Sequence, residues 1–194
     1  MIYNNILCLG DSLTFGARTY GCFPLYLAHQ LESYVGSLKD KNHCYYRVIT
    51  KAVSGFTARD LYFKLCNEIN EVEDTYLTCL LIGTNDCRCQ SDETLFGYYL
   101  KQIILALKIK GMKQIYVGSI PPIYNVADPF YPQTVHSFRK TLNKKIEEVV
   151  NDFPGVFLVD TSPLEPKHYV DSVHFNEDGN LLVASLFSSA IIKS

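Results

Sequence analysis

Short apolar runs alternate with longer amphipathic segments along most of the chain. Five of these runs are brief enough to be strands buried on both faces of a sheet. They span residues 6–9, 46–53, 77–82, 115–120 and 156–159. Each run predicts a strand.

Several segments between the runs carry apolar residues three or four positions apart, which is the spacing of an amphipathic helix. The positions are Leu61, Leu65, Ile69 and Val72; then Leu95, Tyr99, Ile103 and Leu107; then Val135, Phe138, Leu142, Ile146 and Val149. A last helix is expected from residues 176–178 to Ile192, with Leu182, Leu186 and Ala190 among its inward positions.

Residues at the ends of these segments support the assignment. Thr57 and Asp60 have the spacing of a capping box at the start of a helix. Ser91, followed by two acidic residues, suits a helix cap and an acidic first turn. Gly111 after a lysine-rich turn indicates a helix end.

Strand alternating with helix about five times implies a parallel sheet, because parallel strands need crossover connections. The prediction is an α/β fold: a three-layer α/β/α sandwich around a central, mostly parallel sheet of about five strands. Residues 1–194 show no repeat, low-complexity tract or linker and are expected to form a single domain. The long proline-containing loop at residues 121–133 is a candidate pocket wall.

Composition narrows the class of protein. The 194 residues are 47% hydrophobic and 20% charged, which excludes a disordered chain and a collagen-like repeat. A net charge of −2 offers no basic field to nucleic acid. No apolar run approaches the roughly 20 residues that span a bilayer, and the first residues lack the features of a signal peptide. A cytoplasmic protein without a membrane span is therefore expected, its oligomeric state open.

The seven cysteines favour the same compartment. Their number is odd and their spacing irregular, so reduced thiols are expected. Cys87 and Cys89 form the one close pair, without a second cysteine or histidine pair of zinc-site spacing. No metal site is expected.

Polar residues follow three of the predicted strands. Ligands bind open α/β sheets beyond the carboxyl ends of the strands. Ser12 follows the first run, Gly55 the second and Asn85 the third, so a hydroxyl, a glycine amide and a side-chain amide are expected on one rim.

A serine hydroxyl becomes a nucleophile only beside a base that an acid orients. Asp171 and His174, three positions apart, would share one face of a helical turn. Asp171 could then accept from one imidazole nitrogen and leave the other to face Ser12. The Ser12 amide, the Gly55 amide and the Asn85 side chain are donors suited to a developing oxyanion.

Each residue also has a structural interpretation. Ser12 could simply cap a helix, Gly55 could serve a tight turn, and Asn85 could close an Asx turn. Asp11 is expected to bond loop backbone. Asp86 is expected to stabilise its own turn, and is the alternative acid if Asp171 points away.

The chain resembles the GDSL or SGNH hydrolases in four blocks: GDSLTFG at residues 10–16, SGFT at 54–57, GTND at 83–86 and DSVH at 171–174. The blocks occur in the family's order over nearly the whole chain. The resemblance implies Ser12 as nucleophile, His174 as base, Asp171 as its partner, and Ser12, Gly55 and Asn85 as oxyanion donors.

Two positions depart from the family pattern. Lys51 stands where many relatives have Asn, four positions before the block-two glycine, which affects the expected hydrogen bonding around Gly55. Phe175 follows the histidine where many relatives have Pro, and is expected to reshape the pocket wall. The expected pocket residues are Leu13, Phe56, Tyr124, Phe130, Tyr131 and Phe175.

These features predict a serine esterase that acts on a small-molecule ester through an acyl-enzyme, without cofactor. A carbohydrate O-acetylesterase is the first expectation. A lysophospholipase or thioesterase, an acyltransferase on the same site, and a non-catalytic α/β binding module stay open. A nucleotide-binding protein is disfavoured, since neither GxGxxG nor GxxxxGK[ST] occurs.

Overall fold

The computed structural model describes residues 2–37, 44–68, 77–124 and 127–194. Its centre is a five-stranded sheet of order β2-β1-β3-β4-β5, in which every neighbouring pair is parallel. The strands are β1 (Ile2–Gly10), β2 (Cys44–Ala52), β3 (Leu77–Leu81), β4 (Gln114–Gly118) and β5 (Val156–Val159). The predicted sheet is confirmed, although β1 begins four residues before the apolar run that predicted it.

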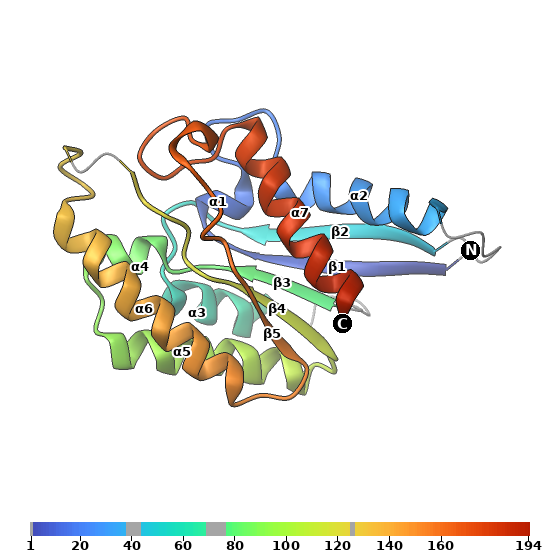
Figure 1. The fold of residues 1–194 in the computed structure, drawn as a ribbon. Helices are drawn as coiled ribbons and strands as arrows, with labels where there is room; N and C mark the ends of the chain where they lie inside the picture. Colours follow the sequence, from blue (N-terminus) through green and yellow to red (C-terminus); the bar gives the residue numbers. More distant parts are fainter. Residues whose placement is uncertain (1, 38–43, 69–76, 125–126) are drawn as a thin grey trace.

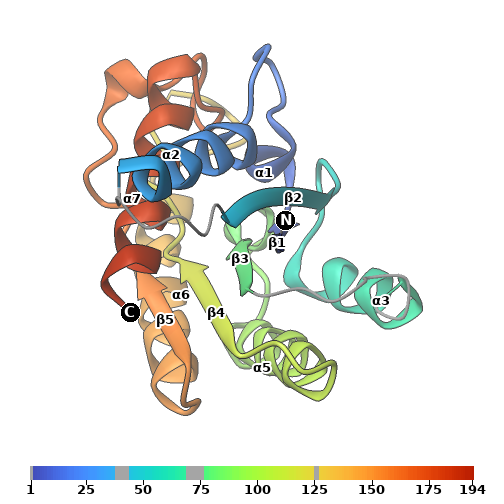
Figure 2. The ribbon, with the colours of Figure 1, turned by 90° about the vertical axis from the view of Figure 1, so that its right-hand side faces the viewer.

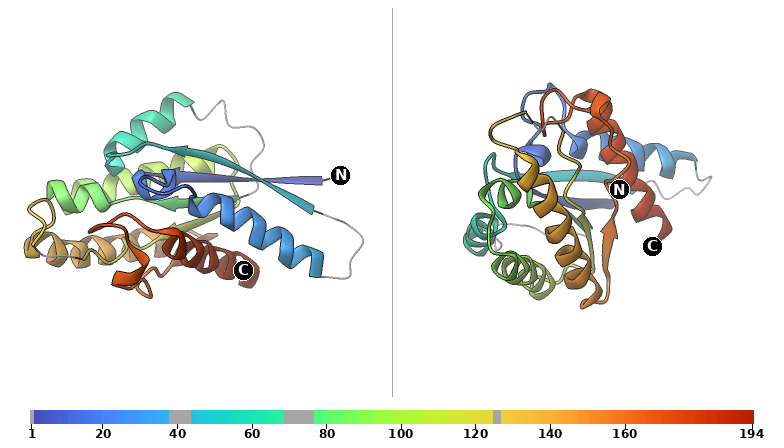
Figure 3. Two further views of the ribbon diagram at one scale, coloured as in Figure 1. Left: turned by 90° about the horizontal axis from the view of Figure 1, so that it is seen from above. Right: turned by 60° about the vertical axis from the view of Figure 1, so that its left-hand side comes forward.

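Helices cover both faces of the sheet (Figure 1, Figure 2). α2 (Phe23–Ser37) and α7 (Glu177–Lys193) lie side by side on one face, and α3 (Ala58–Glu68), α5 (Glu93–Ile109) and α6 (Gln133–Asn151) on the other (Figure 3). Two hydrophobic clusters separate the layers, one under each group of helices. The described residues also form α1 (Ser12–Phe15), α4 (Thr84–Cys89) and the 3₁₀ turn η2 (Pro166–His168).

Most helix boundaries follow the expected signals. The Asp60 carboxylate accepts from the Thr57 amide and hydroxyl at 3.0 and 2.6 Å, which confirms the capping box of α3. Gly111, at φ +94°, follows the C-cap of α5. The side chain of Asn176 caps α7 by accepting from the Gly179 amide. Of the positions expected in the helix that is now α3, Ile69 and Val72 lie outside the described residues.

The expected cap and inward face of α5 need correction. Asp92, and not Ser91, caps the helix: its carboxylate accepts from the amides of Thr94 and Leu95 at 2.8 and 3.0 Å. Leu95 is 56% exposed, because its neighbour Phe96, 1% exposed, occupies the inward face of the first turn.

No helix among the described residues has the length and hydrophobicity to cross a membrane. The cysteines with described side chains, at positions 8, 22, 66, 79, 87 and 89, are free thiols.

Removing the cap of α5 should destabilise the fold modestly. Asp92→Ala leaves two first-turn amides without their acceptor, so the free energy of unfolding should fall by about 1 kcal/mol in urea denaturation. Asp92→Asn keeps the acceptor oxygen and should retain most of the stability. Equal losses in the two variants would contradict the cap assignment.

Candidate active site

Three loops meet at the carboxyl edge of β1, β2 and β3, which are neighbours in the sheet. The Val53 amide donates to the Gly10 carbonyl at 3.2 Å and links the loops after β2 and β1. Asn85 Nδ2 donates to the Phe56 carbonyl at 3.0 Å and links the loops after β3 and β2. Hydrogen bonds therefore fix the three loops to one another.

Ser12 is the first residue of α1, directly after the turn that leaves β1. A side chain at Gly10 would meet the Leu81 carbonyl oxygen at 2.2 Å, so only glycine lets the chain pass this close to β3. Asp11 then caps α1 by accepting from the Leu13 amide at 3.0 Å, as expected of a loop-bonding residue. The sharp turn leaves Ser12 at the end of the strand.

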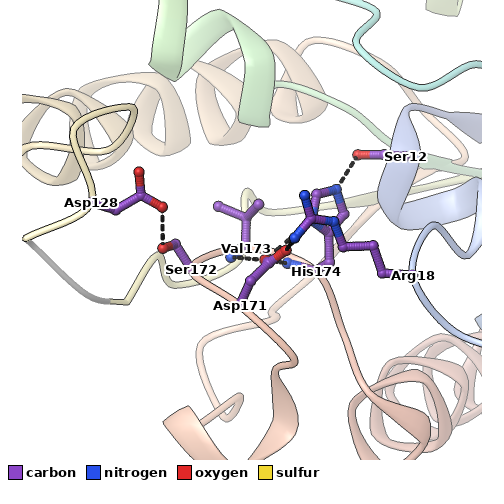
Figure 4. Close-up of polar contacts among 7 residues, drawn as sticks. All are labelled: Ser12, Arg18, Asp128, Asp171, Ser172, Val173 and His174. Atoms are coloured by element: carbon purple, nitrogen blue, oxygen red, sulfur yellow. Dashed lines mark hydrogen bonds and ion pairs between the residues drawn. The ribbon is translucent and has the colours of Figure 1, made fainter.

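Ser12, His174 and Asp171 form a continuous hydrogen-bonded chain (Figure 4). His174 Nε2 lies 3.1 Å from Ser12 Oγ, and Nδ1 lies 2.8 Å from Asp171 Oδ2. With Nδ1–H donating to the carboxylate, Nε2 is left as the acceptor for the serine hydroxyl. The serine and histidine are 162 positions apart in the sequence.

The segment that carries Asp171 and His174 is a closed turn, not the helical turn that their spacing predicted. Tyr169 and Phe175 pair as an antiparallel bridge at its ends. Asp171 Oδ1 accepts from the amides of Val173 and His174 at 2.9 and 2.8 Å. The aspartate therefore organises the backbone as well as the imidazole.

The Asp171 carboxylate has the surroundings of an anion. Burial acts to raise the pKa of Asp171, but hydrogen bonds from the His174 and Val173 amides and from the imidazole outweigh burial and keep the pKa below its ordinary value. Arg18 also contacts this carboxylate, with Nη1 2.8 Å from Oδ2. No motif in the sequence predicts this contact; its one sequence signal is an arginine in a short loop between Gly16 and Gly21.

The expected oxyanion donors lie in the linked loops. Gly55 has φ +86° and open space where a side chain would stand. Asn85 is 5% exposed and uses one N–H on the Phe56 carbonyl, which leaves its second N–H to donate. Lys51 Nζ lies 3.0 Å from Glu68 Oε2. The bond from the Val53 amide to the Gly10 carbonyl holds the loop that leads to Gly55.

Two buried carboxylates lie behind these loops. Burial raises the pKa of Asp11 to about 7, and the negative charge of Asp86 adds to the effect. Burial likewise raises the pKa of Asp86 to about 6. Asp86 Oδ2 accepts from the Ala58 amide at 2.9 Å, so it caps α3 instead of only its own turn. The imidazole bonds Asp171, and Asp86 is not its partner.

Two of the expected pocket residues belong to the core instead. Leu13 is 3% exposed and Phe175 is 2% exposed, and both pack in the cluster under α2 and α7. Each adjoins a residue of the candidate site, Leu13 beside Ser12 and Phe175 beside His174. However, adjacent residues in an extended or tightly turned chain point in different directions, and these two point inward.

The other expected pocket residues are in mixed environments. Phe56 is half-buried, and its carbonyl accepts from Asn85. Tyr131 is 9% exposed and packs in the cluster under α5 and α6. The Tyr124 hydroxyl donates to the Leu164 carbonyl at 2.7 Å. Phe130, at 67% exposure, offers a surface ring.

Asp11 should make the stability of the fold pH-dependent. Its pKa in the folded chain, about 7, lies above its ordinary 3.8, so its contribution to stability is complete below about pH 4 and is lost as the pH rises to 7. Asp11→Asn keeps the cap acceptor but does not ionise. From pH 5 to pH 8, the difference in free energy of unfolding between Asp11→Asn and the unaltered chain, measured by urea titration, should shift by about 2–3 kcal/mol in favour of the variant. A difference that does not vary with pH would contradict the buried, titrating carboxyl.

Comparison with solved structures supports the architecture. An acetyl xylan esterase, AlAXEase, superposes with a TM-score of 0.75 at 18% identity, with 96% of this chain and 99% of that chain covered. Est24, a carbohydrate acetylesterase from Sinorhizobium meliloti, gives 0.78 at 14% identity, with 98% and 99% covered. A member of the lipolytic protein G-D-S-L family from Veillonella parvula gives 0.74 at 16% identity, with 98% and 99% covered.

Sequence comparison assigns the family. A search of curated proteins returns no match. The model of the GDSL-like lipase/acylhydrolase family matches residues 8–182, which include all four blocks. The chain therefore belongs to the GDSL-like lipase/acylhydrolase family, whose members are carboxylic ester hydrolases.

Proposed function

We propose that the protein is a serine esterase that removes small acyl groups, acetyl in the first place, from carbohydrate. The observation that carries the proposal is the chain of hydrogen bonds from Ser12 Oγ through His174 to Asp171. A serine in contact with an imidazole that a carboxylate orients is the arrangement that nucleophilic catalysis requires.

Acylation begins when Ser12 Oγ attacks the ester carbonyl carbon and its proton moves to His174 Nε2. The carbonyl π electrons move to oxygen and form a tetrahedral oxyanion. When this intermediate collapses, the bond to the alcohol oxygen breaks and His174 protonates the leaving alcohol. Asp171 stays ionised throughout and stabilises the imidazolium.

The oxyanion is assigned to the amides of Ser12 and Gly55 and the second Nδ2–H of Asn85. The hydrogen bonds between the loops hold these donors before substrate arrives, so little reorganisation accompanies the reaction. Gly55 suits this role because no side chain obstructs its backbone.

Deacylation repeats the sequence with water as nucleophile. His174 takes a proton from water, the hydroxide adds to the acyl carbon, and Ser12 leaves with the proton returned by His174. Only protein groups and water are needed, and hydrolysis should slow in acid because a protonated imidazole cannot act as base.

The packing around Ser12 favours a small acyl group. A channel for a long acyl chain would need apolar space beside the nucleophile, whereas Leu13 and Phe175 fill the core there. Two of the compared structures are an acetyl xylan esterase and a carbohydrate acetylesterase, which makes acetylated sugars the first substrates to test.

Substitution of the nucleophile tests the proposal. Ser12→Ala and His174→Ala should each lower kcat by about 10⁴-fold or more, because neither leaves a competent nucleophile–base pair. The assay is p-nitrophenyl acetate hydrolysis, with circular dichroism to confirm folding. A fluorophosphonate should label the unaltered chain and not Ser12→Ala. Unchanged hydrolysis in Ser12→Ala would disprove the mechanism, and an unlabelled native chain would favour a binding module.

A substrate series tests the acyl group and the acceptor. Among p-nitrophenyl esters, kcat/KM should fall as the chain lengthens from acetate to octanoate, and acetylated xylo-oligosaccharides should release acetate. Preference for long chains or for lysophospholipid would favour a lipid hydrolase. Transfer of the acetyl group to an added alcohol in preference to water would identify an acyltransferase.

A further inference from the structure

Arg18 joins the loop of the nucleophile to the acid of the triad (Figure 4). Its Nη1 lies 2.8 Å from Asp171 Oδ2, the same oxygen that lies 2.8 Å from His174 Nδ1. The Arg18 side chain is 66% exposed, so the ion pair contributes little to the stability of the fold. The ion pair between Arg18 and Asp171 is therefore better explained by an effect on the position and charge of the Asp171 carboxylate.

The backbone around Arg18 is held in a tight loop. Arg18 has φ +66°, one of two positive values at non-glycine positions in the described part of the chain. An ordinary side chain is disfavoured there, so the conformation persists only because surrounding contacts enforce it. The Thr19 hydroxyl lies within hydrogen-bond distance of the Gly21 and Gly16 carbonyls and accepts from Asn180 of α7 at 3.5 Å.

We propose that Arg18 is a positioning residue, which holds the Asp171 carboxylate against the imidazole and limits how strongly that carboxylate stabilises the protonated base. This inference rests on the esterase mechanism proposed above. It assigns a role to a residue outside the four sequence blocks.

The charges around the triad support this role. Among the described residues, the acids near this unit include Asp11 beside Ser12, Asp128 through its bond from the Ser172 hydroxyl, and the Tyr131 phenol. Two further cations act nearby, Arg88 on Tyr131 and Arg139 on Tyr169, whereas the ion pair to Asp171 comes from Arg18. Within the described ranges, Arg18 is the arginine or lysine that forms an ion pair with Asp171. Its positive charge opposes the positive charge that the imidazole of His174 gains when it takes up a proton.

Arg18→Gln removes the charge while keeping a side chain of similar length. With p-nitrophenyl acetate, kcat should fall about 10-fold or more because the imidazole is less well held, while KM changes less than about twofold. The acid limb of the kcat/KM profile should move to higher pH by about half a unit, since the imidazolium then lacks an opposing cation. Arg18→Lys should restore the acid limb and part of kcat, because an ammonium group supplies the charge without the planar fork.

Arg47→Gln, an exposed arginine on β2, is the matched control and should behave as the unaltered chain. Arg18→Gln kinetics identical to those of Arg47→Gln would overturn the proposal. A rate loss fully explained by fewer fluorophosphonate-titratable sites or a lower Tm would also overturn it, because it would show a merely structural role. Ser12→Ala in the same assay separates the two hypotheses: if it retains activity, the esterase mechanism itself fails.

Discussion

Parallel pairing of β1 with both β2 and β3 is the constraint on which the rest of the site depends. Because parallel strands end at the same edge, the loops that carry Ser12, Gly55 and Asn85 must emerge together. The bond from the Val53 amide to the Gly10 carbonyl and the bond from Asn85 Nδ2 to the Phe56 carbonyl then fix the loops relative to one another. The sheet thus determines the order of the loops, and hydrogen bonds between the loops hold them in place with the small tolerance that a catalytic site requires.

Burial divides the carboxylates around the site into two kinds. Asp11 and Asp86 are enclosed, and their raised pKa values favour the neutral form as the pH falls below 7 and 6. A neutral carboxyl behind Ser12 leaves the proposed oxyanion free of a repelling charge. Asp171 is partly exposed, bonded by two amides and ionised. The same functional group can therefore cap a buried helix or support a base, and its environment decides which.

Different signals in the sequence predict the sheet and the candidate site. The short, bounded apolar run at residues 156–159 predicts β5 at its observed bounds, whereas the motifs predict the roles of Ser12 and His174. Orientation was less predictable. Leu13 and Phe175 point into the core, and Asp171 organises a closed turn, because backbone direction at a tight turn depends on distant contacts. The Arg18 contact depends on tertiary folding, which no local pattern encodes.

The distance between Ser12 and His174 is set by helices that do not themselves react. α2 follows the nucleophile's loop and α7 follows the histidine, and the two pack together. Asn180, 1% exposed, accepts from the Phe23 amide at 3.0 Å, and the rings of Phe23 and Phe187 stack with centroids 5.2 Å apart. A core this dense deforms little, so movement of α7 would carry His174 away from Ser12. The helix pair is therefore part of the geometry that brings Ser12 and His174 together.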